Sequence, residues 1–169
     1  MLTVTVPASL REFLRRHPRE GYGALFAAAA GALKTVAAAD QHLGADTPGF
    51  FGVLHPWGRQ LQYHPHLHYV VPGGGCASHA GRWPAATRGF YLPVRALSPR
   101  FRAKFRAAMG ELDLLGEIDA AVWTGAWTVN CQPVGDAQAS LKYLSRSVFK
   151  VGIAEERIVR ANALEVVFR

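Results

Sequence analysis

The chain has 169 residues, half of them apolar, which suits one folded domain with a substantial core and excludes a disordered chain. Its formal net charge of +7 favours anionic partners, with nucleic acid first and an anionic membrane surface second. Two cysteines without a CxxC context, no signal-peptide pattern at the start, and no apolar run of spanning length predict a soluble cytoplasmic protein with no membrane partner.

The first third of the chain predicts two strands and two helices. Leu2–Val6 alternates in β-rich residues and is stopped by proline, and Ser9–His17 is typical of a short basic helix. Apolar residues at helical spacing predict one long helix over about 19–43, with Gly44 as its C-cap. Residues 50–55 then predict a second strand.

Residues 64–71 predict the strand around which the site is built. Side chains two apart on a strand point the same way, so His66 and His68 converge while Leu67 and Tyr69 turn towards a core. A short connection favours antiparallel pairing with the 50–55 strand.

The second half predicts further strands and helices. Residues 73–86 predict a loop, Phe90–Val94 an edge strand, and Ser98-Pro99 the N-cap and first residue of a helix. Residues 127–132 predict a strand, Asp136 caps a helix to about residue 149, and residues 158–168 predict a closing hairpin. The order predicts one α+β domain over residues 1–169, with a central, mainly antiparallel β-sheet flanked by helices.

The histidines predict a metal site. Four of the seven histidines fall between residues 55 and 68, and imidazoles on a rigid strand suit Mn, Zn or Co. His66 and His68 are the first pair of ligands. His55 leads as the third ligand because its strand can pair beside theirs. The alternatives are His64, behind Pro65, and, with less weight, Gln60 and Gln62.

Tyr143 is the candidate nucleophile. The apolar stripe expected for its helix (Ala137, Leu141, Leu144 and Val148) leaves Tyr143 on a different face, with Ser140, Arg146 and Ser147. A phenolate is a competent oxygen nucleophile where cations offset its ordinary pKa of about 10.

These residues resemble the HUH endonucleases, in which two histidines flank a hydrophobic residue. Longer strings resemble rolling-circle insertion-sequence transposases of the two-tyrosine class: FGVLHPWGR (51–59), HPHLHYVVPGGG (64–75), LPVRALS (92–98) and KYL (142–144). The resemblance covers nearly the whole chain. It implies a domain that nicks and joins single-stranded DNA, with His66 and His68 as the paired histidines, His55 as the third, and Tyr143 as the attacking residue.

The chain departs from that class in three ways, one of which is that members of the class continue beyond the position where this sequence ends. The second tyrosine of the class would fall at position 147, where this chain has Ser147. The cysteine-rich zinc-binding domain that usually precedes the catalytic core has no counterpart in this sequence, so we expect a catalytic core.

The resemblance implies a divalent metal, Mg or Mn, and single-stranded DNA with hairpin transposon ends as the partner, in a bacterial cytoplasm. A 5′-phosphotyrosine intermediate would form at the nicked phosphate. The basic residues expected to contact DNA phosphates are Arg59, Arg100, Arg102, Lys104, Lys142, Arg146 and Lys150.

Two alternatives stay open at this point. One is a catalytically decayed module that binds single-stranded DNA with the same fold, with Ser147 as the mark of decay. The other is a small-molecule enzyme of the cupin type, which also uses an HxH strand. The cupin pattern places a glutamate soon after the histidines, and residues 69–80 contain no carboxylate.

Overall fold

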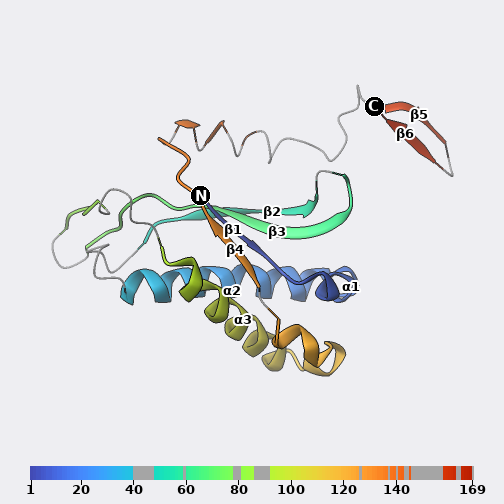
Figure 1. Cartoon of the computed structure of the whole chain (residues 1–169), viewed down its shortest axis with the longest axis horizontal. Helices are drawn as coiled ribbons and strands as arrows, with labels where there is room; N and C mark the ends of the chain where they lie inside the picture. Colours follow the sequence, from blue (N-terminus) through green and yellow to red (C-terminus); the bar gives the residue numbers. More distant parts are fainter. Residues whose placement is uncertain are drawn as a thin grey trace.

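A four-stranded antiparallel sheet covered on one face by helices forms the body of the computed structural model (Figure 1). The structure describes residues 1–39, 48–58, 60–77, 81–85, 92–125, 127–136, 138–139, 141–142, 145, 158–162 and 165–168. In chain order the elements are β1 (Leu2–Thr5), η1 (Ala8–Leu10), α1 (Arg11–Arg16), α2 (Pro18–Ala39), β2 (Phe51–Trp57), β3 (Tyr63–Val70), α3 (Val94–Glu111), η2 (Leu115–Glu117), η3 (Ala120–Trp123), β4 (Thr128–Cys131), β5 (Ile158–Ala161) and β6 (Val166–Phe168).

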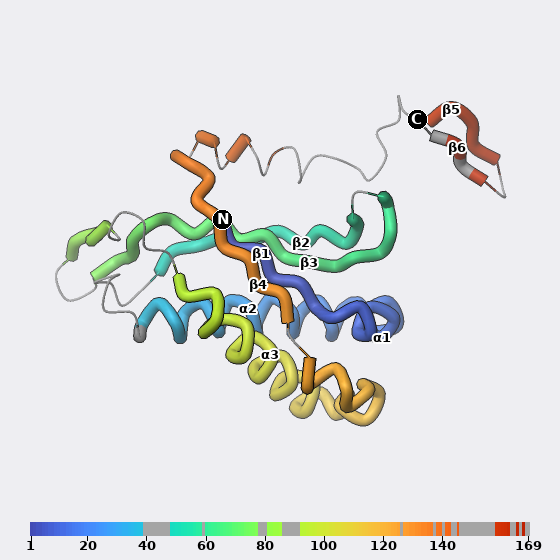
Figure 2. The backbone as a smooth tube through the Cα atoms, in the orientation of Figure 1, coloured from blue at the N-terminus to red at the C-terminus, as the bar shows by residue number. Residues whose placement is uncertain are grey.

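The strand order is β2-β3-β1-β4, so the N-terminal strand lies between β3 and β4 (Figure 2). Every pairing in this sheet is antiparallel. The strands β5 and β6 form a separate two-stranded antiparallel sheet, which confirms the predicted closing hairpin. The predicted α+β class with a mainly antiparallel sheet is confirmed.

The two faces of the sheet differ sharply in chemistry. Leu2, Val4 and Leu67 are buried on the face that α2 and α3 cover. The alternate residues point to the opposite face, where Thr3 lies opposite His68 and Thr5 opposite His66 in the β1–β3 register. The sheet therefore carries an apolar core on one side and polar side chains on the other.

The core is closed by close packing of α2 against α3. Alanines of α2 are buried alongside Leu25 and Leu33, and α3 contributes Phe101, Phe105 and Met109. By length and composition, α2 is also apolar enough to cross a membrane, but half of that stretch is buried inside the molecule. A core helix of a folded domain has the same composition, so this feature is weak evidence for a membrane span.

The helix α3 begins five residues earlier than its sequence predicts. Its first residue is Val94, and the carbonyl of Pro93 accepts bonds from the Ala96 and Leu97 N–H groups. Ser98 does not cap the helix; its hydroxyl donates to the Trp127 carbonyl at 2.6 Å and ties α3 to the start of β4. The edge strand predicted over 90–94 is wrong at its described end, because Leu92 and Pro93 are not in a strand.

The pairing of β2 with β3 is irregular at a point where each strand carries a proline, Pro56 in β2 and Pro65 in β3. His55 lies opposite His66, but Trp57 lies opposite Tyr63, so Pro56 faces two residues of β3. Such a bulge bends the strand and re-aims side chains. Pro65 lies there, just beyond the last pair that β3 makes with β1, so its missing N–H removes no bond from that ladder.

Gly52 tests the packing of the core-facing side of β2. It lies opposite Tyr69, and a Cβ at position 52 would come within 2.6 Å of the Tyr69 ring. The ring is held between Phe26 and Phe50, so it has little room to move. We expect Gly52→Ala to lower the free energy of unfolding by about 1–3 kcal/mol, measured by denaturant titration.

Gly23→Ala is the matched control, because nothing lies within 4 Å of a Cβ there and Gly23 is exposed on α2. It should leave stability unchanged or raise it by up to about 1 kcal/mol. Equal effects of the two substitutions would contradict the packing described for Tyr69.

Candidate metal centre

Three histidines from two neighbouring strands converge on the open face of the sheet. His55 of β2 and His66 and His68 of β3 offer ring nitrogens that all lie within 4.8 Å of one another. The ring centroids are 5.3 Å apart for His55 and His66, 4.6 Å for His55 and His68, and 4.8 Å for His66 and His68. The antiparallel register produces this cluster by placing His55 directly opposite His66.

Hydrogen bonds on the far side of two rings fix which nitrogen faces the cluster. His66 Nδ1 lies 2.6 Å from the carbonyl oxygen of His64, so that nitrogen carries the proton and donates. His68 Nδ1 lies 2.9 Å from the hydroxyl oxygen of Thr3. Because both contacts engage Nδ1, Nε2 is the nitrogen through which each ring would bind a metal, which is the usual arrangement behind metal-binding histidines.

His55 completes the fit to a cation. Its Nε2 is buried and has no hydrogen-bond partner among the described residues. A buried imidazole nitrogen without a partner is unfavourable, and a metal ion shared with the other two rings would satisfy it. The three residues thus fit a divalent metal.

The other proposed ligands lie outside this cluster. His64 Nδ1 accepts a hydrogen bond from Arg11 Nη2 at 2.5 Å. The centroid of the His64 ring is nevertheless only 5.3 Å from that of the His66 ring. Gln62 shapes the β2–β3 turn, where its side chain accepts from the Gln60 N–H and its carbonyl from the Gly58 N–H. Gln60 is exposed in that turn.

Burial keeps the cluster ready to bind a cation. It lowers the pKa of His68 to about 4, with the neighbouring His66 and His55 adding to the effect. Burial, followed by the proximity of His66, also lowers the pKa of His55. Both rings are therefore neutral near pH 7, which is the form that ligates metals.

The candidate nucleophile and several predicted DNA contacts lie outside the described residues, namely Tyr143, Ser147, Arg59, Arg146 and Lys150. The helix before them begins as predicted, since the Ala139 N–H donates to Asp136 Oδ1 at 2.8 Å. In Figure 1 its described residues lie across the sheet from α2 and α3, on the side of the histidines. Lys142 and Leu141 are exposed there, so the described part of the predicted apolar stripe is not buried.

The remaining predicted DNA contacts lie elsewhere. Arg100, Arg102 and Lys104 are on α3, on the helical side of the sheet, so the structure does not bring them to the histidines. Thr3 is a site residue that sequence reasoning missed. The signal was present, because alternation along β1 with Leu2 and Val4 inside places Thr3 on the open face.

Comparison with known proteins points to transposition. A family model described as "Putative transposase" (Y2_Tnp) matches residues 49–169, which include the three histidines and Tyr143. A "Putative transposase" of Sinorhizobium fredii is 37% identical over 185 aligned residues, covering 98% of this chain and 46% of that protein. The chain thus spans about half the length of this curated relative. No solved structure matches the chain.

The metal centre can be tested by Mn²⁺ titration in a calorimeter. Replacing His55, His66 or His68 by alanine should weaken binding at least about tenfold, because each removes one ligand. Thr3→Val should weaken it by about 10–100-fold by freeing the His68 ring. Thr5→Val is the control, because Thr5 lies on the same face of β1 opposite His66. Unchanged affinity in Thr3→Val would show that the hydroxyl does not position His68.

The lowered pKa of His68 predicts acid sensitivity of the metal-free protein. A group with a pKa near 4 when folded and about 6.5 when unfolded takes up its proton more readily in the unfolded chain. The free energy of unfolding should therefore hold above about pH 7, fall as the pH drops towards 4, and level off below, with up to about 3 kcal/mol due to His68. Denaturation in EDTA at stepped pH values measures this, and the slope should shrink in His68→Gln. An equal slope in that variant would contradict the assignment.

Proposed function

Because the chain belongs to the Y2_Tnp transposase family, we propose that it is the catalytic part of a transposase that nicks and joins single-stranded DNA. The observation that carries the proposal is the three-histidine cluster on the open face of the sheet. Its ring nitrogens are oriented from behind by Thr3 and the His64 carbonyl, an arrangement that suits a metal and has no role in the core.

The proposed metal is Mg or Mn, held by His55, His66 and His68. When bound, it would offset negative charge on a DNA phosphate. Nitrogen ligands favour Mn over Mg, so Mn, Zn or Co would bind best in the test tube while Mg serves in the cell.

The proposed nucleophile is Tyr143, on the helix that Asp136 caps. Its phenolic oxygen forms a bond to the scissile phosphorus while the bond from phosphorus to the 3′ oxygen breaks, and the phenolic proton ends on that oxygen. The products are a 5′-phosphotyrosine and a free 3′-OH. The reverse step with the 3′-OH of another strand releases Tyr143 and joins the DNA, so no external energy source is required.

The DNA strand would lie on the histidine side of the sheet. Lys142, exposed on the helix that Asp136 caps, is proposed as one phosphate contact, and Arg59, Arg146 and Lys150 are proposed as further ones. Hairpin transposon ends and a bacterial cytoplasm are part of the proposal.

A second candidate is a binding module of the same fold that has lost nicking. Ser147 favours it, because the second tyrosine of the two-tyrosine class is missing. The cupin alternative has no support in the described sheet, whose four strands carry helices on one face, whereas cupins are jelly rolls of eight strands.

A covalent adduct tests the proposal directly. The protein is incubated with Mn²⁺ and a pool of random single-stranded oligonucleotides labelled at the 3′ end, and labelled protein is detected on a denaturing gel. We expect an adduct that Tyr143→Phe and His66→Ala abolish. Tyr22→Phe is the control, because Tyr22 lies on α2 and its hydroxyl forms a hydrogen bond with the Tyr63 hydroxyl.

Each failure has a distinct meaning. An adduct in Tyr143→Phe would show that another residue is the nucleophile. DNA binding without any adduct in the unmodified chain would favour the non-catalytic module.

A further inference from the structure

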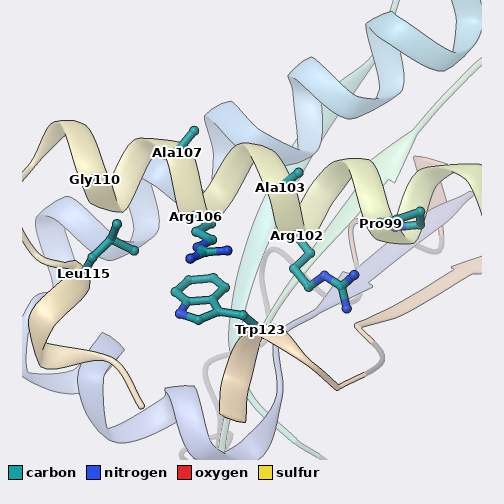
Figure 3. A pocket seen from close by; sticks show the side chains of 8 residues that line it. All are labelled: Pro99, Arg102, Ala103, Arg106, Ala107, Gly110, Leu115 and Trp123. Carbon is teal, nitrogen blue, oxygen red and sulfur yellow. The ribbon is translucent and has the colours of Figure 1, made fainter. Parts of the chain in front are cut away.

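A basic surface lies on the helical side of the molecule, away from the histidines. Figure 3 shows a groove of about 470 Å³ between the outer face of α3 and Trp123 of η3. Its lining comprises Pro99, Arg102, Ala103, Arg106, Ala107, Gly110, Leu115 and Trp123. Two guanidinium groups and one indole are thus gathered over a row of small residues.

The two guanidinium groups are held in place. Arg102 donates from Nη1 to the Gly125 carbonyl at 2.8 Å. Arg106 lies over the Trp123 ring at 5.8 Å, a cation–π contact that leaves its N–H fork free to donate. Because both side chains are already positioned, less rotamer entropy is lost when they bind an anion.

The indole is anchored by the core. Trp123 stacks on Trp127 with ring centroids 5.9 Å apart, and Phe105 packs against both rings. Trp127 is buried and donates from its indole N–H to the Val122 carbonyl. Core packing therefore holds the Trp123 ring, over which the Arg106 guanidinium lies.

None of the described residues that line the groove is acidic, so no carboxylate among them offsets the two guanidinium charges. Glu117, close by on η2, is paired with Arg16 and His17. Asp119 accepts from the Ala121 N–H as the cap of η3. The groove therefore presents positive charge over apolar surface, which matches the phosphates and sugars of a nucleic-acid backbone.

We propose that this groove is a second DNA contact, which binds the phosphodiester backbone of DNA flanking the nicked strand. The proposal rests on the proposed function, since it takes the substrate to be DNA. The buried face of α3, with Phe101, Phe105 and Met109, separates the groove from the sheet. A phosphate in the groove is therefore a different one from the phosphate at the histidines.

Salt-dependent binding tests the groove. Anisotropy of a labelled oligonucleotide pool gives the affinity of the unmodified chain and of Arg102→Ala/Arg106→Ala at several salt concentrations. The double variant should bind about tenfold more weakly, and its slope of log affinity against log salt should be shallower by about 1.4, as two lost phosphates predict. The variant Arg102→Lys/Arg106→Lys keeps the positive charge but loses the bidentate N–H donors of the guanidinium. Its affinity should therefore lie between those of the unmodified chain and the alanine variant.

Arg95→Ala/Lys34→Ala is the matched control, because it removes the same charge from exposed helical positions outside the groove. It should change affinity less than about twofold, and thermal melts check that all variants fold. Equal losses in both alanine pairs, no loss in the groove pair, or no DNA binding by the unmodified chain would overturn the proposal. If the unmodified chain forms no tyrosine adduct, but the groove variant still binds DNA more weakly than the unmodified chain does, the groove proposal stands and only the proposed nicking is refuted.

Discussion

The structure depends on the position of β3 inside the sheet. Because β1 and β2 pair along both of its edges, its side chains are forced into strict alternation. Leu67 and Tyr69 enter the core while His66 and His68 point away from it. A slip of one residue in this register would turn the histidines into the apolar core and Leu67 to the open face, so the packing of the core also fixes the histidine cluster.

A second feature that positions the histidines is the irregularity in the β2–β3 pairing, where Pro56 of β2 and Pro65 of β3 lie. It ends the regular ladder just after His55 meets His66. Beyond it His64 turns to Arg11, while its carbonyl receives the His66 ring. Of three histidines at equal spacing on one strand, two thus lie in the cluster and one supports it from outside, and the third member of the cluster comes from the adjacent strand.

Charge is divided between the two sides of the molecule. On the open face, burial lowers the pKa values of His55 and His68, so these two imidazoles are neutral near pH 7 and can ligate a cation. The outer face of α3 carries the guanidinium groups, two of them held by Gly125 and Trp123. The proposed metal chemistry and the proposed backbone binding would therefore lie on opposite sides of one small domain.

The sequence by itself determined the elements whose pattern is local. The alternation of β1 and β3, the apolar period of α2, the Asp136 cap and the β5–β6 hairpin could all be predicted, and so could the pair His66 and His68. The start of α3 was missed because Ser98 looks like a local cap, whereas its hydroxyl bonds to Trp127, 29 residues away. The sequence also favours His55 as the third member, and the β2–β3 register brings it to the pair. Tertiary structure alone decided that Thr3 supports His68 and that Arg106 lies over Trp123. Those contacts join segments that are distant in the sequence. Strand register and helix packing set them, and no local pattern of residues encodes the register or the packing.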